Sequence, residues 1–188
     1  IYEFDKDGNP IWSTYFGGNK ADFLNSVKVI NQKIVVAGSS ESDSVSNNLC
    51  GVSTNGGFPS CNPSGSYTQT YPGNKCAFIS EFKLDGTLEW STLFGNHDAS
   101  QSEIDGVYKN GSTEIYLVGS TNGSGAPFDK AYFNSFTKSV NSGGYDTYFA
   151  SFHDRDLRWS TLLGGSGDDF GLNLTHDQKF IYFVGKTT

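Results

Sequence analysis

The sequence contains no methionine, only five prolines and three cysteines, and few charged residues, which make up 18% of its 188 positions. Its 13 lysines and arginines are outnumbered by 20 aspartates and glutamates, and they form no run. A nucleic-acid groove needs a basic patch, so we expect no nucleic-acid partner. No apolar run approaches the roughly 20 residues that a membrane-spanning helix needs, so we also expect no membrane insertion.

The residues that are abundant indicate an all-β protein. Glycine occurs 23 times, and aromatic residues, chiefly tyrosine and phenylalanine, make up 15% of the chain. Few charges combined with many aromatic and turn-forming residues are typical of an extracellular all-β protein. The chain begins with Ile1 rather than methionine, so we expect a mature product or a fragment of a longer protein.

All three tryptophans lie in one repeated phrase, Trp-Ser-Thr followed by apolar residues and glycine. Its copies begin at Trp12, Trp90 and Trp159. A second phrase, in which valine shortly precedes a glycine, follows each copy at 36–40, 118–121 and 184–187. A fixed period of tens of residues indicates a repeat architecture. The three tryptophans are therefore predicted to pack one repeat against the next, with sugar stacking as the alternative role.

Each repeat is predicted to contain four antiparallel strands arranged as two hairpins. The first hairpin recurs at 1–16, 78–94 and 148–163. Its first two copies turn at Asp-Gly, a strong hairpin signal because a positive φ is easily adopted there. The third copy turns at 154–156 without a glycine, so we expect a different turn geometry. The second hairpin turns near residues 31–33, 110–111 and 176–178.

Four antiparallel strands per repeat match the blade of a β-propeller. A lone blade cannot bury both faces, and known propellers close with about 4–8 blades. We therefore predict that residues 1–188 are a fragment of a single propeller, about 2–3 blades of a larger ring. The expected partners are the remainder of this propeller and neighbouring domains. The approximate repeat units are 1–77, 78–147 and the incomplete 148–188.

The repeats differ mainly in two long polar insertions, residues 41–74 and 122–142. Insertions at one position of a repeat map to loops on one face, which is often the binding face. Tyrosines in or beside these loops are the best candidates for contact with a ligand, since the blade does not dictate them. They are Tyr67, Tyr71, Tyr132 and Tyr145.

The three cysteines, Cys50, Cys61 and Cys76, all lie in or at the end of the first insertion. Their spacings are much longer than the Cys-x-x-Cys pairs of metal sites. We expect one disulfide and one free thiol, with the pairing open, and the alternative is three free thiols. A disulfide implies an oxidising compartment, and thus an extracellular or cell-surface protein.

The most acidic local cluster is Asp168-Asp169, matched by Asp22 in the first repeat. Such side chains commonly cap a turn by accepting hydrogen bonds from backbone N–H groups. A calcium loop and a catalytic carboxylate pair are the alternatives. Recurrence along the chain favours capping, because a catalytic site is not normally repeated. We expect no catalytic residue and no cofactor, with calcium at these three aspartates as the weaker hypothesis.

The repeated phrases resemble a known family. Residues 82–95 with 117–121, and residues 152–185, follow the pattern Phe-x-x-Asp-Gly-x-x-x-Trp-Ser-Thr-x-Phe-Gly-Gly, an acidic pair and Val-x-Gly-Ser-Thr. This pattern is similar to the SBBP repeat, a β-propeller repeat of secreted bacterial proteins. Phe58-Pro59 and Pro127-Phe128 lie where such repeats often carry Phe-Pro, and Cys76 lies where the family has aspartate.

The resemblance implies a large exported protein, and some members resemble Bacteroidetes cell-surface proteins that leave by type IX secretion. The family has no catalytic motif, and adhesion or scaffolding is its usual inferred role. Our leading hypothesis is a non-enzymatic extracellular module for adhesion or for binding a surface protein or glycan. The alternatives are a propeller-type glycosidase or lyase whose site lies outside this fragment, and a purely structural spacer.

Overall fold

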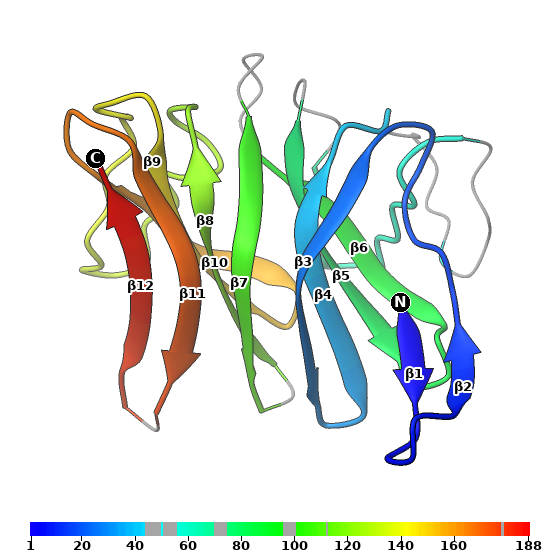
Figure 1. Ribbon diagram of the computed structural model, residues 1–188. Helices are drawn as coiled ribbons and strands as arrows, with labels where there is room; N and C mark the ends of the chain where they lie inside the picture. Colours follow the sequence, from blue (N-terminus) through cyan, green and yellow to red (C-terminus); the bar gives the residue numbers. More distant parts are fainter. Residues whose placement is uncertain (44–49, 51–55, 70–74, 96–100, 112, 178) are drawn as a thin grey trace.

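The computed structural model is built from twelve β-strands, which confirms the predicted all-β class (Figure 1). It describes residues 1–43, 50, 56–69, 75–95, 101–111, 113–177 and 179–188. Within these ranges no helix is present, and thus none that could cross a membrane.

Eight strands form two four-stranded antiparallel sheets, and two hairpins flank them. The first sheet contains β3 (Asp22–Ile30), β4 (Lys33–Ser40), β5 (Cys76–Lys83) and β6 (Leu88–Phe94). The second contains β7 (Ser102–Asn110), β8 (Glu114–Thr121), β9 (Asp146–His153) and β10 (Asp156–Leu163). The hairpins are β1 (Tyr2–Phe4) with β2 (Pro10–Ser13), and β11 (Asp169–His176) with β12 (Ile181–Thr187).

The two complete sheets have the same strand order and the same register. Gly38 of β4 faces Phe78 of β5, and Gly119 of β8 faces Tyr148 of β9. By the same alignment, β1–β2 corresponds to β5–β6 and to β9–β10, whereas β11–β12 corresponds to β3–β4 and to β7–β8. Each complete sheet therefore joins the second hairpin of one sequence repeat to the first hairpin of the next.

The turns of the first hairpin follow the sequence. Gly8 and Gly86 have φ angles of +87° and +83°, as the Asp-Gly dipeptides predict. In the third copy, Asp154 and Arg155 both have positive φ, at 48° and 68°. Two consecutive left-handed residues form the tight two-residue turn that matches the twist of a hairpin. The predicted change of turn geometry is confirmed.

The sheets stand beside one another, with β3, β7 and β11 as adjacent strands (Figure 1). The amide of Asn25 on β3 donates to the carbonyl oxygen of Ile104 on β7 at 3.1 Å. The N–H of Gly171 on β11 donates to the hydroxyl of Ser120 on β8 at 3.3 Å. These hydrogen bonds join neighbouring sheets. Apolar side chains fill the space between the sheets.

Tryptophan lies between sheets in the first two copies of the phrase. The indole of Trp12 donates to the carbonyl oxygen of Leu84, in the β5–β6 turn, at 3.0 Å. Trp90 is fully buried, with its ring 5.6 Å from that of Phe152 in the next sheet. Trp159 instead packs against Phe149 of its own sheet, at 5.0 Å.

The glycine of the second phrase lies opposite a β-bulge. The pairing of β3 with β4 shifts between Leu24 and Ser26, and that of β7 with β8 shifts between Ile104 and Gly106. At each bulge the neighbouring backbone carbonyl oxygen occupies the place where a Cβ of Gly38 or Gly119 would be. Only glycine permits so close a backbone approach, which explains why the phrase carries it.

Candidate functional site

The two long insertions leave and rejoin the sheets at the end opposite the tight turns of the first hairpins (Figure 1). Part of each insertion runs along the outer strand of its own sheet. Cys61 and Ser91 of β6 exchange two backbone hydrogen bonds, at 3.0 and 2.8 Å. In the second sheet, the N–H of Ser160 on β10 donates to the carbonyl oxygen of Lys130 at 3.0 Å. These segments are therefore part of the repeated scaffold.

Each insertion also contributes one phenylalanine to the core. Phe58 and Phe128 are both fully buried, and they come from the two Phe-Pro segments. The ring of Phe58 lies 5.1 Å from that of Phe78, and the ring of Phe128 lies 4.8 Å from that of the equivalent Tyr148. Burial of an aromatic ring stabilises by a few kcal/mol, so these residues anchor the insertions to their sheets.

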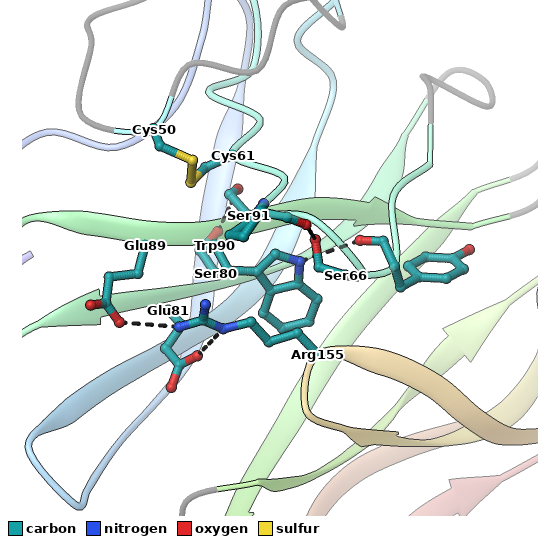
Figure 2. The surroundings of a disulfide bond; sticks show 11 residues. Cys50, Cys61, Ser66, Ser80, Glu81, Glu89, Trp90, Ser91 and Arg155 are labelled. Atoms are coloured by element: carbon teal, nitrogen blue, oxygen red, sulfur yellow. Dashed lines mark hydrogen bonds and ion pairs between the residues drawn. A yellow bond between two sulfur atoms is a disulfide. The ribbon is translucent and has the colours of Figure 1, made fainter.

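A disulfide joins Cys50 to Cys61, and Cys76 is a buried free thiol (Figure 2). The expectation of one bridge is confirmed, and the structure identifies the pair. Burial raises the pKa of the Cys76 thiol, so this group stays protonated and unreactive. The bridge ties the first insertion to the segment paired with β6, and a disulfide is consistent with an extracellular protein.

The four candidate tyrosines have different surroundings. Tyr67 packs into the core between the sheets, with its ring 5.7 Å from that of Phe152, and Tyr71 lies outside the described residues. The guanidinium of Arg158 lies 4.2 Å from the ring centre of Tyr132 and donates to its hydroxyl at 2.6 Å. Of the three candidates that the structure describes, Tyr132 is exposed and Tyr145 is partly exposed.

Tyr145 belongs to a small cavity at the loop-bearing end. The cavity has a volume of about 210 Å³ and is lined by Lys75, Gln101, Ser102, Glu103, Tyr145 and Phe170. Tyr145 stacks on Phe170 with ring centres 5.3 Å apart, and its hydroxyl donates to the side-chain carbonyl of Gln101 at 2.8 Å. Lys75 pairs with Glu103 at 2.6 Å. We call these six residues the end cavity. It combines aromatic faces with hydrogen-bonding groups of both kinds.

The residues that meet here differ between equivalent positions of the two sheets. Tyr145 directly precedes β9, as Lys75 precedes β5, and Phe170 on β11 is equivalent to Glu103 on β7. The ion pair of Lys75 with Glu103 is thus replaced at the next sheet by the stack of Tyr145 on Phe170. The backbone repeats at this place, whereas these side chains do not.

The three aspartates proposed as calcium ligands accept hydrogen bonds from the protein itself. One carboxylate oxygen of Asp22 accepts from the N–H of Gly18 at 2.7 Å, and Asp169 accepts from the N–H of Gly165 at the same distance. Asp168 accepts from the N–H of Tyr145 at 2.9 Å. The bonds of Asp22 and Asp169 come from a residue four positions earlier, which is the geometry of turn capping, whereas the bond of Asp168 joins two loops. Among the described residues no group of three or more histidine, cysteine, aspartate or glutamate side chains is placed to hold a metal.

A cluster of charged residues between the two complete sheets was not predicted from the sequence. Lys109 and Glu81 are almost fully buried and lie 2.6 Å apart. Arg155, in the β9–β10 turn, reaches back to Glu81 at 2.8 Å and to Glu89 at 3.1 Å (Figure 2), and Lys33 also pairs with Glu89. We call these five residues the inter-sheet ion cluster.

Opposing effects act on the pKa of Glu81. Burial alone would raise it, but the hydrogen bonds and positive charges of Lys109 and Arg155 outweigh burial and lower it. A sequence signal for this cluster exists, since Lys109 follows buried Val107 at a spacing of two and therefore points to the same side of β7. The cluster joins the two complete sheets through charged side chains from both of them.

Asp105, at the bulge of β7, has a pKa raised to about 6 by burial and by the charge of Glu103, with Lys75 opposing. A folded-state pKa above the ordinary value of 3.8 means that the contribution of Asp105 to stability is fully present below pH 3.8 and is lost as the pH rises through about 6. We expect Asp105→Asn to raise the free energy of unfolding at pH 7.5 by about 1 kcal/mol, after allowance for the partly exposed side chain.

Urea unfolding between pH 4 and pH 8 measures this effect. The gain should vanish near pH 4, and the exposed control Asp129→Asn should change stability by less than about 0.5 kcal/mol at every pH. A gain of equal size at pH 4 and pH 8 would contradict the assignment, because it would not arise from ionisation of Asp105.

Comparison with known proteins assigns the chain to no family. No model of a protein family matches it, and no curated protein is significantly similar to it. The class that the structure itself defines is an all-β protein of repeated four-stranded antiparallel sheets, with one disulfide in its first long insertion.

Proposed function

We propose that the chain is a non-enzymatic extracellular binding module in which the sheets are blades of an SBBP-type β-propeller. In this proposal the rigid blades present the long insertions and the end cavity to a surface protein or glycan. The side-by-side sheets and their shared register support the propeller interpretation. The disulfide supports an extracellular location.

One observation carries the binding role. At the loop-bearing end the equivalent residue pair changes from Lys75 with Glu103 to Tyr145 with Phe170, although the backbone around it repeats. Stacked aromatic rings beside an amide and an ion pair suit a sugar ring or a peptide side chain with hydroxyl or amide groups. Such aromatic anchors commonly contribute most of the affinity at a binding site.

The test is a screen of the purified 188-residue chain against glycan and surface-protein arrays, followed by titration of each hit. We expect Tyr145→Ala to weaken binding of a hit about tenfold or more, since the variant removes the stacking ring. Leu84→Ala, at the opposite end of the first sheet, is the control and should bind as the parent chain does. If the arrays yield no hit, or if Tyr145→Ala binds like the parent, the proposed site is wrong.

A further inference from the structure

A cavity adjoins the inter-sheet ion cluster, between the two complete sheets. It has a volume of about 330 Å³. Its charged lining consists of three cations, Lys33, Lys109 and Arg155, and two carboxylates, Glu81 and Asp154. These residues come from strand ends and turns of both complete sheets, each of which has all four of its strands. The charged groups of the cluster therefore face a space that is large enough for a small ligand.

The charges around this cavity do not cancel. The inter-sheet ion cluster contributes three cations and two carboxylates. Two more charged residues belong to the set: Lys83 lies 4.0 Å from Glu89, and Asp154 lines the cavity and lies 3.4 Å from His153. With histidine counted as neutral, the set carries four positive and three negative charges. We call the remaining positive charge the charge excess, and a buried charge of this kind is costly unless a counter-charge is present.

Two of the cations also have hydrogen-bond donors to spare. An ammonium group carries three N–H donors, yet that of Lys109 bonds to one acceptor within the described part of the chain, Oε1 of Glu81. Arg155 uses Nε for Glu81 and Nη2 for Glu89, and its Nη1 donates to no described residue (Figure 2). Because buried donors without an acceptor are destabilising, the cavity suits a group that accepts hydrogen bonds.

The charge excess belongs to this one place and not to the repeated backbone. By the register of the sheets, Ser151 is the equivalent of Glu81, and His176 is the equivalent of Lys109. Both equivalents line the corresponding space beside β11, which thus lacks the buried ion pair. The same backbone is built without these charges, so the fold itself does not require them.

We infer that the cavity binds one small monovalent anion, and that a carboxylate is the group that fits it best. A carboxylate has one negative charge, which balances the charge excess, and two oxygens that accept hydrogen bonds from ammonium and guanidinium groups. The volume of about 330 Å³ holds such a group together with several waters, since one water occupies about 30 Å³. Sulfate would accept from the same donors, but its second charge would leave a negative excess. This inference does not depend on the ligand proposed for the end cavity.

Heteronuclear NMR of the arginine Nε–H groups tests the inference directly. The chain has two arginines, Arg155 at the cavity and Arg158 outside it, so the second signal is an internal control. The probe is sodium formate, titrated in a zwitterionic buffer, and Arg155→Lys assigns the two signals. We expect the Arg155 signal to shift and saturate with a dissociation constant of about 1 mM or weaker, since a ligand of three heavy atoms allows no tighter binding. The Arg158 signal should not move.

Lys33→Met tests whether the charge excess drives binding. Lys33 lines the cavity and its side chain is 30% exposed, so the variant removes one cation without opening the buried core. Loss of the charge excess should weaken formate binding about tenfold. Lys6→Met removes a cation that is 87% exposed and pairs only with Asp7 among the described residues, so it should bind formate as the parent does.

Three results would overturn the inference. If the Arg155 signal does not saturate up to about 100 mM formate, far above the expected dissociation constant, water alone occupies the cavity. If Lys33→Met binds formate as tightly as Lys6→Met, the charge excess does not drive binding. If sulfate binds more tightly than formate, the site does not select a single negative charge.

Discussion

Lys109→Met is expected to lower the free energy of unfolding at pH 7 by about 3–5 kcal/mol, the usual cost of removing one partner from a buried ion pair. The side chains of Lys109 and Glu81 are only 2% and 4% exposed, so the carboxylate of Glu81 is poorly solvated when its partner is lost. Arg155 keeps its contact with one carboxylate oxygen of Glu81, but the oxygen bonded to Lys109 is left without a donor. A buried carboxylate in this state is strongly destabilising.

The pH dependence separates this electrostatic effect from a packing defect. Because the folded-state pKa of Glu81 lies below its ordinary value of 4.5, the stabilisation is present above pH 4.5 and is lost as the pH falls through the folded-state pKa. The difference between Lys109→Met and the parent should therefore shrink in acid. Denaturant unfolding at pH 7 and pH 4 measures it.

Two further variants control this experiment. Lys6→Met removes an exposed ion pair with Asp7 and should change stability by less than about 1 kcal/mol. Glu81→Leu combined with Lys109→Met removes both buried charges, so it should cost less than the sum of the single changes. Strict additivity of the two single variants would show that the pair is not coupled.

Gly119→Ala is expected to lower the free energy of unfolding by about 3 kcal/mol or more, the range of severe overpacking. An added Cβ would overlap with the carbonyl oxygen of Glu103 and lie 2.8 Å from the hydroxyl of Tyr148. The first of these atoms is backbone within the β7 bulge, so it cannot move without breaking the β7–β8 pairing. A flexible side chain could yield, but a paired strand cannot.

Thermal and urea unfolding of Gly119→Ala measure this cost. The matched control is Gly165→Ala, where an added Cβ meets nothing within 4 Å, so its stability should stay within about 0.5 kcal/mol of the parent. If both variants are as stable as the parent, the β-bulge can accommodate a Cβ at position 119. Close backbone approach would then not explain the glycine of the second phrase.

Much of the local structure could be predicted from the sequence because it depends on neighbours along the chain. Alternating residues and Asp-Gly turns define the hairpins, and the missing glycine at Asp154-Arg155 correctly predicts a different turn. The assembly of hairpins into sheets could not be predicted in the same way. Pairing of β4 with β5 spans the first long insertion, and no local pattern specifies whether a hairpin joins the one before it or the one after.

Prediction of the candidate site was limited for a related reason. A tyrosine in a polar insertion looks exposed in the sequence, yet Tyr67 packs between sheets because its segment runs along β6. Tyr145 acquires its neighbours Gln101 and Phe170 only when three separate strands meet. The inter-sheet ion cluster likewise joins residues as far apart as Lys33 and Arg155 through their common partner Glu89.

The offset between sequence repeats and sheets has an evolutionary consequence. Each sheet draws one hairpin from each of two successive repeats, so duplication of one repeat inserts one whole sheet into the row. Unequal recombination between repeats can therefore lengthen or shorten the array by whole sheets.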